Sequence, residues 1–135
     1  MNKPENCIPK DKHDIESIKK LSDFEYPYYK SILPSLFEWI QDINWPVAQK
    51  IVPLLLKAGI DTVPHIKHIL QTDDYVWQYW TITFVIDKFE DNIKKKIVEE
   101  LYLDLERLAY NPIDEEKKEE LDVVAKAVLI NKSLD

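Results

Sequence analysis

Residues 33–59 read "LPSLFEWIQDINWPVAQKIVPLLLKAG", a stretch that predicts two helices joined by a short turn. Pro34 suits the first turn of one helix and Pro46 the first turn of the next, because the N–H that proline lacks is unpaired in a first turn anyway. Gly59 follows the second helix, where a residue in the left-handed conformation often ends a helix. The stretch therefore predicts a helical hairpin.

The same pattern recurs 30 residues later in the chain. The matching positions share proline or apolar character: Leu33-Pro34 with Val63-Pro64, Trp45 with Tyr75, and Leu54 with Phe84. Residues 75–86 are also rich in β-branched and aromatic side chains, which favour strands. The repeat nevertheless favours a second helical hairpin. Such units cannot bury their apolar faces alone and stack on their neighbours, as in an α-solenoid.

We therefore predict an all-α fold, a short α-solenoid of about eight helices in antiparallel hairpins, with a different helical bundle as the main alternative. The whole chain, residues 1–135, is expected to form a single domain. Its expected parts are N-terminal cap helices in residues 1–33, repeated hairpins in residues 34–59 and 62–89, and a C-terminal hairpin in residues 91–131. In the last part, residues 93–110 and 114–130 are each expected to form one continuous amphipathic helix.

Two resemblances follow from these motifs. Residues 33–59 resemble a HEAT repeat, with a proline near the first helix, an Asp/Asn turn, the pair Val-Ala and a leucine run. The combination "IPKDKHDIESIKKL", "ILPSLFEWIQDINWPVA", "VPHIKHIL" and "DDYVWQYW" resembles an uncharacterised small bacterial family, the domain of unknown function 5071. This resemblance runs from about Ile8 to the C-terminus. It implies a bacterial cytosolic helical-repeat protein and carries over no activity or site residue.

Composition disfavours several classes of function. The net charge is −7, which disfavours nucleic-acid binding because that needs a clustered positive surface. Gly59 is the sole glycine, so phosphate-binding loops and nucleophile elbows are excluded. Cys7 is the sole cysteine, so no internal disulfide can form, and we expect it in a mobile N-terminal tail. We see no apolar leader or membrane span, and predict a cytoplasmic protein without membrane contact.

The aromatic stretch "DDYVWQYW", residues 73–80, raises the question of a binding surface. On a helical wheel Trp77 and Trp80 share one side with Phe84, and we predict that these side chains are core. Tyr75 and Tyr79 point elsewhere and align with Trp45 and Gln49 of the preceding repeat. We predict that these four residues, Trp45, Gln49, Tyr75 and Tyr79, form a ridge on the concave face. Partial burial against the adjacent hairpin is the alternative.

No constellation of catalytic residues is visible. His65 and His68 have a spacing that can hold a metal, but they lack a third ligand, so they are weak candidates and we expect no metal or other cofactor. The leading hypothesis is a non-enzymatic protein–protein interaction module that binds a basic partner through its concave face. A small-molecule binder using the aromatic middle is the alternative. An enzyme acting on nucleic-acid bases, as some HEAT-like folds do, is disfavoured by charge. The partner and the oligomeric state stay open.

Overall fold

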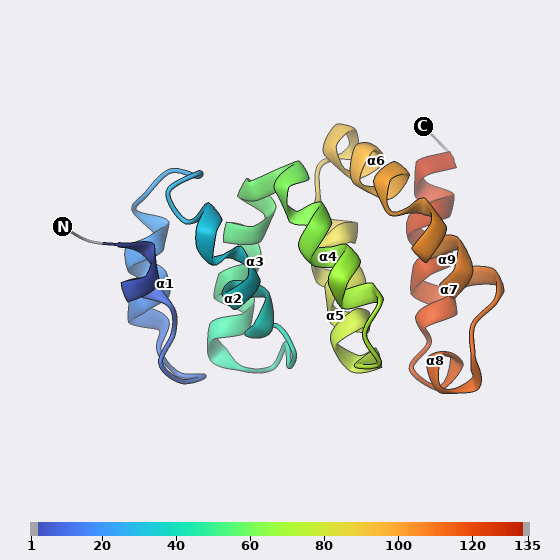
Figure 1. Cartoon of the computed structure of the whole chain (residues 1–135), viewed down its shortest axis with the longest axis horizontal. Coiled ribbons are helices and arrows are strands. Elements are labelled where there is room, and N and C mark those ends of the chain that lie inside the picture. The colour runs from blue at the N-terminus through green and yellow to red at the C-terminus, as the bar shows by residue number, and fades with distance from the viewer. Residues whose placement is uncertain (1–2, 134–135) are drawn as a thin grey trace. The chain divides into compact units, whose positions relative to one another are not determined.

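The computed structural model describes residues 3–133, and the side chains of residues 3–130. Within residues 3–133 the regular secondary structure is all helical and no strand is present, which confirms the all-α prediction (Figure 1). The α-helices are α1 Ile15–Ser22, α2 Leu33–Glu38, α3 Pro46–Ala58, α4 Val63–Leu70, α5 Tyr75–Phe84, α6 Asp91–Glu100, α7 Tyr102–Tyr110, α8 Asp114–Lys118 and α9 Leu121–Ser133. Short 3-10 helices are η1 Pro4–Cys7, η2 Lys30–Ile32, η3 Gly59–Thr62 and η4 Ile86–Lys88. The solenoid arrangement stays a prediction.

Local chemistry sets several helix ends. Asp14 caps α1 by accepting a hydrogen bond from the Ser17 N–H, and Asp74 caps α5 by accepting one from the Trp77 N–H. Gly59 ends α3 with φ +56°, in the region that side chains other than glycine rarely adopt. These ends follow from local chemistry, so the sequence alone suffices to place them.

The chain divides into two compact units, Met1–Thr62 and Val63–Asp135. In the first unit α1 and α2 both pack against α3. Tyr29 is fully buried there, and its hydroxyl donates a 2.7 Å hydrogen bond to the Leu54 carbonyl of α3. Cys7 is also buried, within η1, so the expectation of a mobile tail at this position is wrong. The reason is that η1 packs against α1 and η2, which cover the thiol.

The second unit contains α4 to α9, in which α9 packs against α5, α6, α7 and α8. Two breaks in it contradict the predicted continuous helices. The segment 93–110 divides at the buried Leu101 into α6 and α7. The segment 114–130 divides after α8, where Glu120 has φ +60°. The break at Leu101 lets α6 bury Ile97 and Val98 while α7 buries Leu105 and Leu108, and the break at Glu120 separates α8, whose buried residue is Glu116, from α9. Tertiary packing thus overrides the local helical pattern.

The orientation of α5 also differs from the prediction. Its buried residues are Gln78, Thr81 and Ile82, whereas Trp77, Trp80 and Phe84 are half-buried. The predicted core assignment of those three aromatic residues is therefore wrong. Gln78, Thr81 and Ile82 have the i, i+3, i+4 spacing of one helix face. This face is buried because α4, α9 and η4 all pack against the helix.

Among residues 3–133, no helix combines the length and the apolar character needed to cross a membrane.

Candidate functional site

The four residues of the predicted ridge lie in both units. In the first unit Trp45 is half-buried, and its ring makes an edge contact with Trp39 at a centroid distance of 5.7 Å. Gln49 is exposed, and its side-chain amide donates to the Ile43 carbonyl at 3.4 Å. Tyr75 and Tyr79 lie on α5 of the second unit and are half-buried. A shared concave surface for all four stays a prediction.

Gln49 also lines a pocket between α1 and α3 with a volume of about 350 Å³. Its floor is apolar, with Ile18 and Pro53, and its rim carries Lys19 and Lys50. Lys19 is exposed and pairs with Glu16 on its own helix at 3.4 Å. The polar part of this pocket therefore consists of solvated surface side chains.

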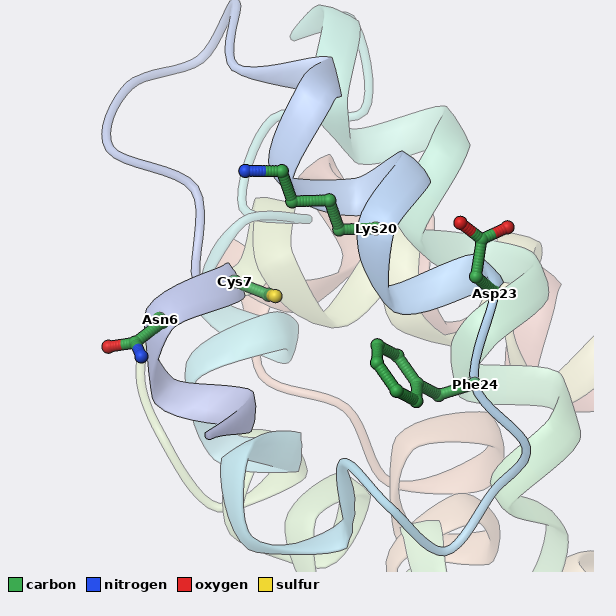
Figure 2. A pocket seen from close by; sticks show the side chains of 5 residues that line it. All are labelled: Asn6, Cys7, Lys20, Asp23 and Phe24. Atoms are coloured by element: carbon green, nitrogen blue, oxygen red, sulfur yellow. The ribbon is translucent and has the colours of Figure 1, made fainter. Parts of the chain in front are cut away.

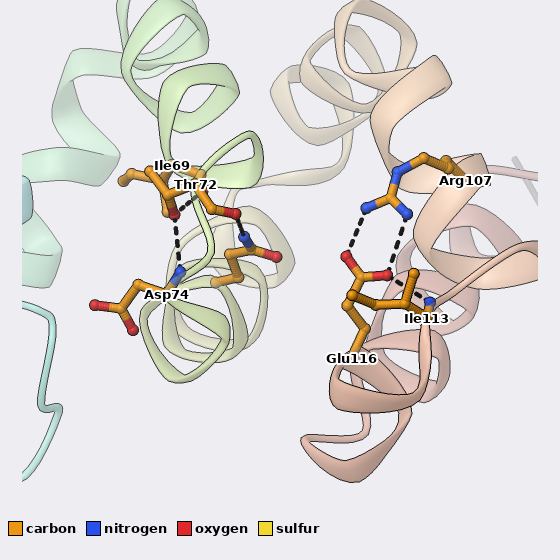
Figure 3. A network of polar contacts seen from close by, with 7 residues as sticks. Ile69, Thr72, Asp74, Arg107, Ile113 and Glu116 are labelled. Atoms are coloured by element: carbon orange, nitrogen blue, oxygen red, sulfur yellow. Dashed lines mark hydrogen bonds and ion pairs between the residues drawn. The ribbon is translucent and has the colours of Figure 1, made fainter.

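The start of α5 is fixed by a hydrogen-bonded turn (Figure 3). The Thr72 hydroxyl donates to the Ile69 carbonyl at 2.7 Å and accepts from the Asp74 N–H at 3.3 Å. The buried Gln78 side chain donates to the Thr72 carbonyl at 2.8 Å. Because these bonds join the turn to the helix, they set the rotation of α5 and the direction in which its aromatic side chains point.

A second polar cluster connects α7 with α8 (Figure 3). Arg107 donates two hydrogen bonds to the Glu116 carboxylate, at 3.1 and 2.6 Å, and the Ile113 N–H donates a third at 2.9 Å. Burial acts to raise the pKa of Glu116, but the bonds from Arg107 and Ile113 and the charge of Arg107 outweigh it and lower that pKa. Glu116 therefore stays ionised and holds α8 against α7.

The same ion pair affects Arg107. The pKa of Arg107 is raised, chiefly by its hydrogen bond to Glu116.

One face of α5 forms a pocket with the turn between α8 and α9. Its volume is about 210 Å³, and we call it the aromatic pocket. It is lined by Val76, Tyr79, Trp80, Lys118, Glu119 and Glu120. Tyr79 and Trp80 meet edge to face at a centroid distance of 5.2 Å, and Trp80 meets Phe84 at 5.7 Å. Aromatic surface and carboxylates therefore lie side by side in one pocket.

The aromatic pocket contains Tyr79 of the predicted ridge but also residues that the sequence analysis missed. Val76, Tyr79 and Trp80 have the i, i+3, i+4 spacing of one helix face, a signal that was available. The contribution of Lys118 to Glu120 had no such signal, because it depends on the positive φ of Glu120, and no glycine marks that turn.

A further pocket, of about 310 Å³, lies in the first unit (Figure 2). It is lined by Asn6, Cys7, Lys20, Asp23 and Phe24, and Figure 2 shows the Cys7 thiol pointing toward the Phe24 ring. Phe24 in turn stacks on Tyr28 at 4.1 Å. These five lining residues include no histidine, so the pocket lacks the Cys–His pair that commonly activates a thiol.

The two weak metal candidates lie on α4. His65 is half-buried and His68 is exposed. Within the described residues, no group of three or more His, Cys, Asp or Glu side chains is arranged to hold a metal ion.

Comparison with known proteins gives one finding. No curated protein matches the chain significantly. A family model described as a domain of unknown function matches residues 7–129, which is most of the chain and includes every residue of the predicted ridge. The chain therefore belongs to the family described as domain of unknown function (DUF5071).

Proposed function

We propose that this protein is a non-enzymatic protein–protein interaction module that binds a basic partner through the aromatic face of α5. The proposal includes the HEAT-like repeat arrangement, bacterial source and cytoplasmic location that the sequence analysis predicts. The observation that carries it is the aromatic pocket, where Tyr79 and Trp80 lie beside Glu119 and Glu120.

Residue chemistry supports this choice of surface. Tyrosine and tryptophan offer large contact areas with polar tips and are enriched among the residues that dominate interface energetics. Tyr79 and Trp80 are half-buried, so each ring is held by its neighbours while part of its surface stays accessible. Side chains restrained in this way lose little conformational freedom when a partner binds.

Charge supports a basic partner. The chain carries a net charge of −7, which attracts a positively charged protein over long range and speeds association at low salt. The same charge repels the phosphates of nucleic acid, so it does not support the alternative of an enzyme that acts on nucleic-acid bases.

The size of the aromatic pocket favours a protein over a small molecule. Small-molecule sites usually measure roughly 300–1,000 Å³. A shallow pocket of about 210 Å³ suits one side chain of a larger partner.

The proposal is tested by affinity capture from the source cell with a double variant. Trp45→Ala combined with Tyr79→Ala is expected to cost little stability, because both side chains are only half-buried, and to abolish capture of the partner. Circular dichroism checks the fold of the variant. Tyr110→Ala is the matched control, because Tyr110 is an exposed tyrosine outside the predicted ridge.

Two outcomes would contradict the proposal. One is a folded double variant that captures the same partner as the wild-type protein does. The other is a partner whose capture is lost equally in the Tyr110→Ala control. Trp45→Phe and Tyr79→Phe keep the aromatic area, and capture should persist with both.

A further inference from the structure

We propose that the aromatic pocket binds the guanidinium group of an arginine side chain, which makes arginine the anchor residue of the basic partner. This inference rests on the proposed function, and it adds the chemical group that the pocket recognises. Three features support it: the aromatic surface, the unpaired carboxylates and the shape of the turn beside them.

The aromatic surface suits a planar cation. Tyr79 and Trp80 both line the pocket, and their rings are 82° apart; Trp80 also packs against Phe84, at 60°. A cation over an indole ring is the strongest of the cation–π contacts with protein side chains. Guanidinium stacks flat on an aromatic face and is more weakly hydrated than an ammonium group, so it loses less solvation on binding.

The carboxylates are available to a ligand. Within residues 3–130, neither the Glu119 nor the Glu120 side chain takes part in an ion pair, whereas the nearby Glu116 is fully engaged by Arg107. Carboxylates accept two parallel hydrogen bonds from guanidinium, a geometry that ammonium does not match. Lys118 lines the same pocket, and its positive charge repels a cation. Together with Glu119 and Glu120 it gives the lining a net charge of −1.

The turn fixes these charges beside the rings. Glu120 has φ +60°, a conformation that is unfavourable for a residue other than glycine. Its N–H donates to the Lys117 carbonyl at 2.9 Å, which holds the turn closed. The backbone between α8 and α9 thus keeps Glu119 and Glu120 at the rim of the pocket.

A titration of the ¹⁵N-labelled full chain with N-acetyl-arginine methylamide tests the inference. We expect the indole N–H signal of Trp80 to shift progressively, while those of Trp39 and Trp45 stay in place. N-acetyl-citrulline methylamide has the same shape without the charge, and it should leave Trp80 unchanged. The lysine analogue should bind several-fold more weakly than the arginine analogue.

Variants that remove a charge from the pocket should change arginine binding in opposite directions, according to the sign of the charge removed. Glu119→Gln combined with Glu120→Gln should weaken arginine binding roughly five-fold, as expected for the loss of two exposed ion pairs. Lys118→Gln should strengthen it. Glu115→Gln removes an exposed charge of α8 outside the pocket and should change nothing. Glu120→Gly also relieves the backbone at φ +60°, so it should weaken binding without loss of stability.

An unresponsive Trp80 signal, equal binding of citrulline or lysine, or unchanged affinity in the double glutamine variant would each overturn the assignment. The two proposals fail separately. If capture of the protein partner depends on Tyr79 while the arginine analogue does not bind, the guanidinium assignment falls and the proposed function stands. If the Trp80 signal shifts with the arginine analogue but capture of no partner depends on Tyr79, the guanidinium assignment stands and the proposed function falls.

Discussion

Replacing Ile82 with alanine should lower the free energy of unfolding by about 2–5 kcal/mol, the usual cost of truncating a large core aliphatic side chain. Ile82 is fully buried on the face of α5 that packs against the rest of the second unit. Trp77 precedes it by five residues and is only half-buried, so Trp77→Ala should cost clearly less, although tryptophan is larger. Urea denaturation followed by circular dichroism measures both variants.

This comparison tests the rotation of α5 directly. If Trp77→Ala lowered the free energy of unfolding more than Ile82→Ala does, Trp77 would lie in the core, as the sequence analysis predicted. Val76→Ala serves as a control on the same helix, because Val76 is 42% exposed and its truncation should change stability little.

Replacing Arg107 with leucine should destabilise the second unit by about 2–3 kcal/mol near neutral pH. Breaking a fully buried ion pair costs about 3–5 kcal/mol, and the value here is lower because 43% of the Arg107 side chain is exposed. The loss arises because Glu116, whose side chain is 5% exposed, keeps its charge without its partner. Chemical denaturation at neutral pH measures the difference in the free energy of unfolding between the wild-type protein and Arg107→Leu.

The pH dependence of this effect has a definite sign. The pKa of Glu116 is lowered in the folded protein, so its stabilising contribution is present above its ordinary pKa and is lost as pH falls through the folded value. In Arg107→Leu the effect of burial is no longer outweighed by Arg107, so the pKa of Glu116 rises. The stability difference between the wild-type protein and the variant should therefore shrink as pH falls through the raised Glu116 pKa of the variant, and it should level off below the lowered Glu116 pKa of the wild-type protein.

A double-mutant cycle supplies the control. Replacing Arg107 and Glu116 together with leucine should cost less than Arg107→Leu alone, because no buried charge is left unpaired. A pH-independent difference, or a double variant less stable than the single one, would show that Arg107 acts through packing and not through the Glu116 charge.

Local signals explain which parts of the fold were predictable. Pro34, Pro46 and Gly59 each mark a helix end through their own backbone chemistry, and the structure has these ends in place. The breaks at Leu101 and Glu120 lie in segments with continuous helical patterns. They depend on contacts between distant segments, which no local pattern contains.

The orientation of α5 was missed for a different reason. Gln78, Thr81, Ile82 and Val85 have the i, i+3, i+4, i+7 spacing of a buried face, but the first two are polar, and the tryptophans drew the assignment toward Trp77. Gln78 is buried because its amide bonds the Thr72 carbonyl in the preceding turn. Hydrophobicity alone does not reveal such a pairing.

The candidate site was predictable only in part. Tyr75 and Tyr79 were singled out because they depart from the expected core face of their helix. Glu119 and Glu120 lie in the charged run "DEEKKEELD", residues 114–122, whose charge pattern favours a solvated helical surface. Their position beside Trp80 follows from the turn at Glu120, so the acidic half of the aromatic pocket emerged from the structure.

The most direct test of the proposed function is an amide and indole chemical-shift map of the ¹⁵N-labelled protein with its captured partner. We predict that the largest shifts fall on Tyr79, Trp80, Glu119 and Glu120, and that they diminish with added salt, because the contact is between a basic partner and an acidic surface. Shifts confined to other surfaces, such as the exposed Leu103 on α7, with the aromatic pocket unchanged, would contradict the account.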